Sequence, residues 1–252
     1  QDTGLQPNVI TCSALISACE KSSRWALACL LLAELPKRAL RPGVVAYNAT
    51  MSACGRARHW RRALALFAAI REDGLLPDVI SHNAAISACE KGEQWPRALC
   101  LLGDLRRSGL QPSGVTYGAL VSACEKGGRW QEAYELFSEA GRSCLPPSTI
   151  VRSAMISACE KGGQWELALS VLAEAARGGL PLDLIAYNAS ISACEKGQQW
   201  QPALQLLADL RRRGLLPDVV THNALISACG RALLWVRSCA LLSELRLGRR
   251  DA

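Results

Sequence analysis

Apolar residues recur along the chain at the spacing of amphipathic helices, in two short stretches of each repeating segment. In one copy of the first stretch they step by three or four residues: Leu184, Tyr187, Ile191 and Cys194. One copy of the second stretch has the i, i+3, i+4, i+7 pattern: Trp165, Ala168, Leu169 and Leu172. The pattern therefore predicts two helices per segment, and neither helix can bury its apolar face alone.

Capping and turn-forming residues mark the ends of these helices. Asp183 follows a proline-containing turn and can cap the first helix, and Gly197 ends that helix. The second helix is expected to begin near Trp200 and to close at Gly214, with Pro217 soon after it.

The pattern repeats every 35 residues without insertion or deletion. Each copy has one cysteine in its first stretch: Cys19, Cys54, Cys89, Cys124, Cys159, Cys194 and Cys229. Six residues later a tryptophan opens the second stretch: Trp25, Trp60, Trp95, Trp130, Trp165, Trp200 and Trp235. A fixed period of this length is typical of a helical solenoid. The sequence predicts an all-α fold, an α-solenoid in which tandem helix-turn-helix repeats form a right-handed superhelix without strands.

The repeats are expected to form one array over residues 9–252. The seven units span 9–43, 44–78, 79–113, 114–148, 149–183, 184–218 and 219–252, and the last is one residue short. Residues 1–8 are interpreted as the tail of a preceding repeat, because Gly4-Leu5-Gln6-Pro7 matches Gly74-Leu75-Leu76-Pro77. We therefore expect a segment of a longer array.

Cysteine is abundant, but neither disulfides nor a metal site are expected. Seven of the 12 cysteines share one apolar repeat position, where cysteine acts as a small buried hydrophobe. The others are scattered and form no Cys-x-x-Cys pair: Cys12, Cys29, Cys100, Cys144 and Cys239. Free thiols in this number fit a reducing compartment. The tryptophans are interpreted as packing residues, and the apolar stretches are too short for a membrane span.

No catalytic constellation is evident, so this segment is not expected to be an enzyme, to hold a cofactor or to bind a small-molecule substrate. His82 and His222 share a repeat position that is filled elsewhere by Tyr47, Tyr117 and Tyr187. That interchange favours packing over catalysis. The net charge of +7 gives a mild preference for anionic partners.

The opposite face of the first helix carries the pattern that points to function. Its first position is always a β-branched aliphatic: Ile10, Val45, Ile80, Val115, Ile150, Ile185 and Val220. Its last position is always basic: Lys21, Arg56, Lys91, Lys126, Lys161, Lys196 and Arg231. A variable polar or small residue lies between them: Ser13, Asn48, Asn83, Gly118, Ser153, Asn188 and Asn223. A second variable residue ends each unit: Gly43, Asp78, Ser113, Ser148, Asp183 and Asp218. Variable donors and acceptors beside a constant cation suit base readout next to phosphate contacts, although a helix-end cation also interacts favourably with the helix dipole.

The unit closely resembles the pentatricopeptide repeat over essentially the whole chain, in segments such as Val219-Val220-Thr221-His222-Asn223-Ala224-Leu225-Ile226 and Gly214-Leu215-Leu216-Pro217-Asp218. The tetratricopeptide repeat, with about 34 residues and a different pattern, fits less well. The resemblance implies single-stranded RNA binding with one base per repeat, in chloroplasts or mitochondria, for RNA processing, stabilisation, editing or translation. In the family, the fifth and last residues of a repeat select the base and the second residue sandwiches it.

The family pairing also implies a target sequence. Asn48 with Asp78 and Asn188 with Asp218 match the uracil-preferring pair, Asn83 with Ser113 resembles a cytosine-preferring pair, and Ser153 with Asp183 resembles a guanine-preferring pair. Ser13 with Gly43 and Gly118 with Ser148 depart from the common pairs, and Asn223 has no partner in the sequence. The implied site reads any-U-C-any-G-U-pyrimidine from 5′ to 3′.

Two other functions remain open. Helical solenoids often act as protein–protein scaffolds, and other RNA-processing proteins are candidate partners here. The segment could also target a longer RNA-processing enzyme whose catalytic domain lies outside it.

Overall fold

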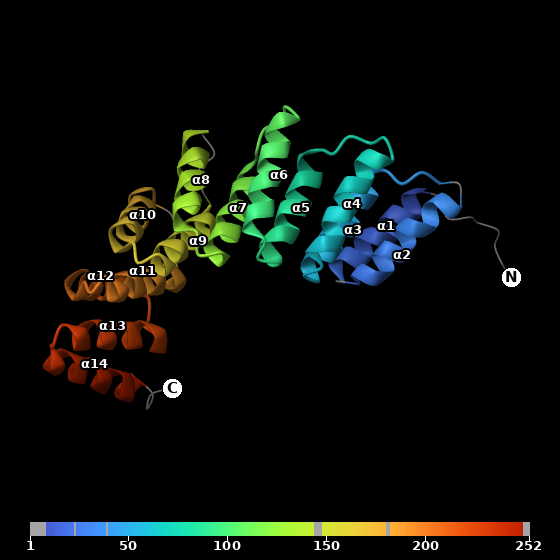
Figure 1. Cartoon of the computed structure of the whole chain (residues 1–252). Coiled ribbons are helices and arrows are strands. Elements are labelled where there is room, and N and C mark those ends of the chain that lie inside the picture. The colour runs from blue at the N-terminus through green and yellow to red at the C-terminus, as the bar shows by residue number, and fades with distance from the viewer. Residues whose placement is uncertain (1–8, 23, 39, 144–147, 180–181, 249–252) are drawn as a thin grey trace. The chain divides into compact units, whose positions relative to one another are not determined.

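The computed structural model describes residues 9–22, 24–38, 40–143, 148–179 and 182–248, and of these it leaves out the side chains of 9, 10 and 244–248. The described residues form 14 helices and no strand (Figure 1): α1 (Val9–Lys21), α2 (Trp25–Lys37), α3 (Val44–Arg56), α4 (Trp60–Glu72), α5 (Val79–Lys91), α6 (Trp95–Arg107), α7 (Gly114–Lys126), α8 (Trp130–Arg142), α9 (Thr149–Lys161), α10 (Trp165–Arg177), α11 (Leu184–Lys196), α12 (Trp200–Arg212), α13 (Val219–Arg231) and α14 (Trp235–Gly248). The predicted tail at residues 1–8 and the last residues of the seventh repeat lie outside this description.

The helices begin where the sequence pattern places them. Every odd-numbered helix begins at the first residue of a unit, and every even-numbered helix begins at the recurrent tryptophan. The Asp183 side chain caps α11 by accepting a hydrogen bond from the Ala186 N–H at 2.9 Å. Gly197 follows that helix, and Gly214, with a positive φ of 75°, follows α12. The prediction of tandem helix-turn-helix repeats is confirmed.

The chain divides into two compact units, the first up to Gly127 with helices α1–α7 and the second from Gly128 with α8–α14. In the first unit, α3 packs against α1 and α5 and against α2 and α4. In the second, α11 packs in the same way against α9, α13, α10 and α12. Within each unit, the even-numbered helices of the described residues do not pack on one another. The inner odd-numbered helices α3, α5 and α11 are therefore flanked on both sides and covered behind. The right-handed superhelix stays a prediction.

Small residues line the contact between consecutive odd-numbered helices. Ala53, Cys54, Ala88 and Cys89 are fully buried in the first unit. A Cβ atom added to Gly55 would lie 3.2 Å from the Cα atom of Ala88, so α3 and α5 approach closely at this point. Desolvation raises the pKa of the buried thiols, to about 11 for Cys89. The interpretation of the recurrent cysteines as small hydrophobes is confirmed.

One contact between cysteines was not predicted from the sequence. Cys29 is one of the scattered thiols, and like the other cysteines of the described residues it is free. In the structure its sulfur lies 3.6 Å from that of Cys54. The 35-residue period relates residues at the same position of different repeats. Cys29 and Cys54 occupy different positions of adjacent repeats, so the period does not predict their contact. Among the described residues, no group of three or more histidine, cysteine, aspartate or glutamate side chains could hold a metal ion.

The position shared by histidine and tyrosine is a packing position, as predicted. His82 and Tyr187 are fully buried, and Tyr47, Tyr117 and His222 are nearly so. The His82 Nδ1 atom lies 2.9 Å from the carbonyl oxygen of Asp78, so its N–H can donate there. The Tyr187 hydroxyl donates to Asp209 Oδ2 at 2.5 Å.

The tryptophans join neighbouring repeats. Each half-buried indole of four repeats lies on the glycine that ends the first helix of the following repeat: Trp60 on Gly92, Trp95 on Gly127, Trp130 on Gly162 and Trp165 on Gly197. A Cβ atom on Gly92 would lie 2.3 Å from Trp60 Cδ1, so glycine is required for this approach. Their role as packing residues is confirmed for these repeats, whereas Trp235 is 72% exposed. None of the helices in the described ranges has the length and apolar character needed to cross a membrane.

Replacing one of these glycines should destabilise the array. A Cβ atom on Gly127 would lie 2.3 Å from Trp95 Cδ1, so Gly127→Ala should lower the free energy of unfolding by about 1–3 kcal/mol. The control is Gly103→Ala in α6, because a Cβ atom there meets nothing within 4 Å. That substitution should stabilise by about 1 kcal/mol through helix propensity. Urea unfolding followed by circular dichroism measures both effects, and a stabilised Gly127→Ala would contradict the packing role of the tryptophan.

Candidate nucleic-acid interface

A row of exposed aliphatic side chains marks the open side of the odd-numbered helices. In the first unit Val45, Ile80 and Val115 are 69%, 64% and 69% exposed. In the second unit the exposed fractions of Ile150, Ile185 and Val220 are 78%, 65% and 55%. Ile10 belongs to the same set, but its side chain lies outside the described residues. Burying one of these side chains fully would stabilise the fold by about 1.5–3 kcal/mol, and this stabilisation is absent while the side chain is exposed. The recurrence of an exposed aliphatic side chain in the six repeats where this side chain is described therefore indicates a surface that binds a partner.

Three of the predicted base-reading pairs are in contact. The Asn48 amide donates to Asp78 Oδ1 at 3.3 Å, and the Asn83 amide donates to Ser113 Oγ at 3.3 Å. In the second unit the Asn188 amide donates to Asp218 at 3.1 Å. Each contact joins the fifth residue of one repeat to the residue immediately before the next odd-numbered helix. The two variable positions of a repeat therefore form one polar site.

The last residue of a repeat also caps the next helix. Asp78 accepts from the Ser81 N–H at 2.7 Å and Asp218 from the Thr221 N–H at 2.8 Å. The same capping bond is made by Ser113, Ser148 and Asp183. Helix capping alone would favour aspartate and serine here. Capping does not distinguish aspartate from serine, so base recognition would have to account for which of the two occurs in a given repeat.

A threonine at the third repeat position completes two of the polar sites, and sequence reasoning missed it. Thr116 Oγ1 donates to Asn83 Oδ1 at 2.6 Å, and Thr221 Oγ1 donates to Asn188 Oδ1 at 2.6 Å. Both threonines are fully buried. With oxygen and nitrogen both engaged, the amide is held in one orientation. A hydroxyl residue directly after the exposed aliphatic was the signal available in the sequence.

Asn48 differs from Asn188 although both belong to predicted uracil-preferring pairs. Asn48 is only 7% exposed, and its Oδ1 atom is buried without a hydrogen-bond partner. The next repeat has Ser81 in place of threonine, and its hydroxyl donates to Asp78 Oδ1 at 2.9 Å instead of reaching Asn48. The two amides therefore present different surfaces to a ligand.

The remaining predicted pairs are not joined in this way. Ser153 and Asp183 make no hydrogen bond with each other. Gly43 and Gly118 have no side chain, so neither the pair Ser13–Gly43 nor the pair Gly118–Ser148 can form the contact that links Asn188 to Asp218. Asn223 is exposed on α13.

The capping carboxylates have lowered pKa values. Desolvation alone would raise the pKa of Asp218, but hydrogen bonds from the Thr221 backbone and hydroxyl and from the Asn188 amide outweigh it and lower the pKa. Asp78 is lowered in the same way by Ser81 and Asn48. Both carboxylates therefore stay ionised at neutral pH.

The capping role predicts a pH-dependent difference between the parent and Asp218→Asn, whose side-chain oxygen can still accept the capping bond. A lowered folded-state pKa contributes stability above the unfolded value of about 3.9, and this contribution is lost as the pH falls through the folded value. The parent should therefore be the more stable protein at pH 6, and the difference in urea midpoint should shrink as the pH falls below about 3.9. A difference that stays constant over this range would contradict the ionised cap.

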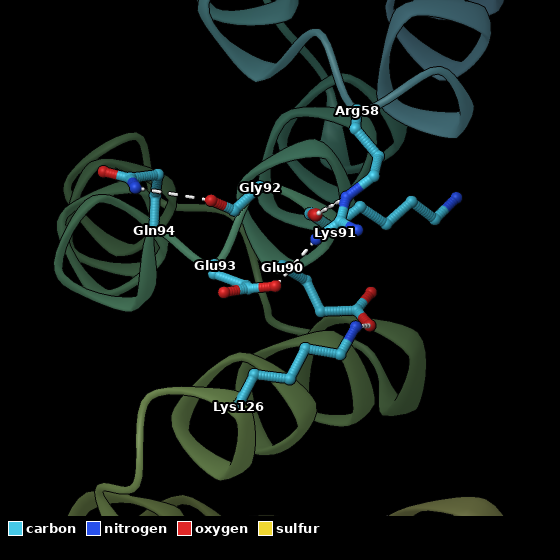
Figure 2. Close-up of polar contacts among 7 residues, drawn as sticks. All are labelled: Arg58, Glu90, Lys91, Gly92, Glu93, Gln94 and Lys126. Atoms are coloured by element: carbon cyan, nitrogen blue, oxygen red, sulfur yellow. Dashed lines mark hydrogen bonds and ion pairs between the residues drawn. The ribbon is translucent and has the colours of Figure 1, made fainter.

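Four of the recurrent cations pair with glutamates of the preceding repeat. Lys126 Nζ lies 2.7 Å from Glu90 Oε1 (Figure 2), and Lys196 Nζ lies 3.0 Å from Glu160 Oε1. Arg56 pairs with Glu20 at 3.3 Å and Arg231 with Glu195 at 2.8 Å. The cations are therefore more than solvated helix ends. Because all four are more than a third exposed, each pair contributes at most about 1 kcal/mol.

Lys91 has no such pair, because Gly55 stands where the preceding repeat would supply the glutamate. Among the described residues no acidic group pairs with its ammonium group, which points away from the Glu90–Lys126 pair in Figure 2. Its backbone carbonyl accepts from Arg58 Nε at 3.0 Å. A pocket of about 150 Å³ beside Gly55 is lined by Glu20, Ser52, Gly55, Arg56, Ala84, Ser87, Ala88 and Lys91. Lys91 and two serine hydroxyls at this pocket could hold an anion, whereas Arg56 would first have to exchange Glu20 for it.

Comparison with protein families identifies the repeat. The model described as PPR repeat family matches residues 42–91 and 182–231, and the model described as pentatricopeptide repeat domain matches residues 1–57. A third, described as PPR repeat, matches residues 115–144, 150–180 and 220–247. A comparison with curated proteins gives no match.

Solved structures of similar fold include the pentatricopeptide repeat protein PPR10 from maize, with 27% identity and a TM-score of 0.68 over 93% of this chain and 34% of that chain. PPR10 in complex with an 18-nt psaJ RNA element has 24% identity and a TM-score of 0.56, over 95% of this chain and 40% of that one. The PPR domain of Arabidopsis thaliana protein-only RNase P 1 in complex with tRNA has 15% identity and a TM-score of 0.61, covering 69% and 91%. The chain thus spans between a third and two fifths of the length of PPR10.

Proposed function

The chain belongs to the pentatricopeptide repeat family, and on that premise we propose that it binds single-stranded RNA along the open side of its odd-numbered helices, with one base per repeat. The observation that carries the proposal is the exposed β-branched aliphatic beside a polar site, which recurs in both units. Repeat proteins of this fold solved with an RNA element or with tRNA give further support.

In the proposed mode, the aliphatic side chains contact the faces of the bases and the polar pairs contact their edges. Ile185 and Val220 would flank one base in the second unit, where the Asn188 amide lies between their helices. Stacking of this kind tolerates any base. Specificity would therefore come from the amide, whose second N–H and second oxygen lone pair are not used by Asp218 and Thr221.

The proposed target reads any-U-C-any-G-U-pyrimidine, and the geometry ranks its positions. Asn83 and Asn188 are each held by two partners, so their donors and acceptors are pre-oriented. Asn48 is more buried and its oxygen is inaccessible. We therefore expect stronger discrimination at the Asn83 and Asn188 positions than at the Asn48 position.

Changing Asn188 to Thr should move one base preference and no other. Family pairing implies that Thr with Asp218 favours guanine, whereas the parent pair favours uracil. A wrong base should cost about 1–3 kcal/mol, by analogy with side-chain readout of DNA bases. The measurement is a binding series with each of the four bases at that position, for the parent and the variant.

Asn223→Thr is the matched control, because it should change the preference at the neighbouring base and leave the Asn188 position untouched. Equal binding of all four bases by the parent would contradict base readout. A shift elsewhere in the target would show that the register is wrong.

We further propose that the recurrent cations contact the RNA backbone, and that Lys91 is more available than the four cations that pair with a glutamate. If all seven cations met phosphates, the slope of log K against log salt would be about −5, at roughly 0.7 per contact. Paired cations must first exchange a glutamate for a phosphate. Lys91 has no glutamate to exchange, and the pocket beside Gly55 gives an anion room next to Arg56.

Two substitutions on adjacent residues test this arrangement. Lys91→Ala should make the salt slope less steep by about 0.7 and weaken all RNA sequences alike. Glu90→Ala should do the reverse, because it releases Lys126 from its ion pair: binding should tighten and the slope should steepen. Fluorescence anisotropy with a single-stranded oligonucleotide over a range of KCl concentrations measures both. Unchanged slopes would mean that these cations serve only to join repeats.

The competing function is a protein–protein scaffold, since exposed aliphatic side chains also suit an apolar peptide groove. Selection from a random RNA pool distinguishes the two: an RNA-binding protein should enrich a motif of about seven nucleotides, one for each repeat. Recovery of no motif, with binding that does not depend on salt, would favour the scaffold. For the cellular role we propose RNA processing, stabilisation, editing or translation in chloroplasts or mitochondria, alone or as the targeting part of a longer enzyme.

A further inference from the structure

Two thiols from adjacent repeats face each other in the first unit. Cys29 lies on α2 and Cys54 on α3, and their sulfur atoms are 3.6 Å apart. Cys54 is fully buried, whereas Cys29 is partly exposed. The two helices pack directly on one another.

The pair arises from a substitution at one repeat position. The position of Cys29 is occupied in the later repeats by Leu64, Leu99, Tyr134, Leu169, Leu204 and Cys239. The buried cysteine of the first helix, by contrast, occurs in every repeat. At the other junctions between complete repeats, the residue equivalent to Cys29 is leucine or tyrosine. Only at the first junction does a second thiol occur at this position, next to the recurrent cysteine of the following repeat. Leucine is sufficient for packing at this position in other repeats. The thiol of Cys29, unlike leucine, can also form a disulfide.

We propose that Cys29 and Cys54 form a reversible disulfide that links the first two repeats. A disulfide bond is about 2.05 Å long, so the sulfur atoms need to approach by only about 1.5 Å. Rotation of the partly exposed Cys29 side chain can supply that movement. The contact already present therefore places both sulfurs within reach of bond formation.

The surroundings favour Cys29 as the attacking thiolate. Its hydrogen bond with Cys54, and then the charge of Arg62, outweigh desolvation and lower the pKa of Cys29 to about 7. Trp25 lies one helical turn before Cys29 on α2, and the Arg62 guanidinium lies 4.3 Å from the centre of the Trp25 ring. This contact holds the charge of Arg62 on the same side of α2 as Cys29. Buried thiols of later repeats differ, because desolvation raises the pKa of Cys159 to about 12 and that of Cys194 to about 11. Among the thiols that are not fully exposed, oxidation should therefore favour Cys29 over these buried cysteines.

The oxidant is a low-molecular-weight disulfide, such as oxidised glutathione. The Cys29 thiolate attacks one sulfur of this reagent, which forms a mixed disulfide and releases one glutathione thiolate. Cys54 gives its proton to the released thiolate and attacks the Cys29 sulfur, which expels the second glutathione. Two protein thiols are thereby oxidised to one disulfide, and one glutathione disulfide is reduced to two thiols. Excess reduced thiol reverses both steps.

The test is equilibration of the whole chain with oxidised glutathione, followed by acid quenching, proteolysis and mass spectrometry. The exposed Cys100 and Cys239 would form their own mixed disulfides, so Cys100→Ser and Cys239→Ser are made in both parent and variant. In the parent we expect a cross-linked peptide that contains Cys29 and Cys54, lacks two hydrogens and disappears on reduction with dithiothreitol.

Cys29→Leu is the matched variant, because leucine occupies this position in four of the complete repeats. It should keep the helical circular dichroism spectrum, give no such peptide and leave the Cys54 thiol reduced. Three outcomes would overturn the proposal: a parent that keeps both thiols in pure oxidised glutathione, a mixed disulfide on Cys29 that never resolves, or a bridge between other cysteines. The measurement uses no RNA, so its outcome is independent of the proposed function.

Discussion

The close packing of consecutive odd-numbered helices is the constraint on which the other features depend. Alanine and cysteine at the contact, as in Ala53, Cys54, Ala88 and Cys89, let these helices approach without large side chains between them. With neighbours on both sides and even-numbered helices behind, an inner odd-numbered helix has one open side. The exposed aliphatics, the polar pairs and the cations all lie on residues of that side. A larger residue at the contact would therefore separate neighbouring polar sites as well as destabilise the core.

The candidate site consists of junctions between repeats rather than of single repeats. Asp218 illustrates this, because it ends one repeat, caps α13 of the next and holds the Asn188 amide. The Glu90–Lys126 pair likewise joins two repeats while the lysine occupies the proposed phosphate position. Stability and the proposed recognition thus use the same atoms. Substitutions that alter recognition have to preserve the cap, which is why Asp218→Asn is more informative than Asp218→Ala.

Most of the fold could be predicted from the sequence, because the period and the capping residues determine where each helix begins. The exposure of Val45 and of Ile185 could also be predicted, since helical spacing places each of these residues opposite the apolar face of its helix. The contacts of the site could not. Periodicity compares equivalent positions, whereas Thr221 reaches Asn188 in the previous repeat and Cys29 reaches Cys54 in the next. Such contacts depend on side-chain direction across a junction, which a repeat pattern does not encode.

Departures from the consensus act locally, because each repeat in a solenoid contacts only its neighbours. Gly55 removes one glutamate and so leaves Lys91 without the ion pair that Lys126 has. Ser81 removes one hydrogen bond to the Asn48 amide, and Cys29 introduces one thiol pair. Each change modifies a single junction while the helices on either side keep their bounds. A chain built this way can vary the chemistry at one position of a ligand without altering the others, which is the property that recognition of a linear polymer requires.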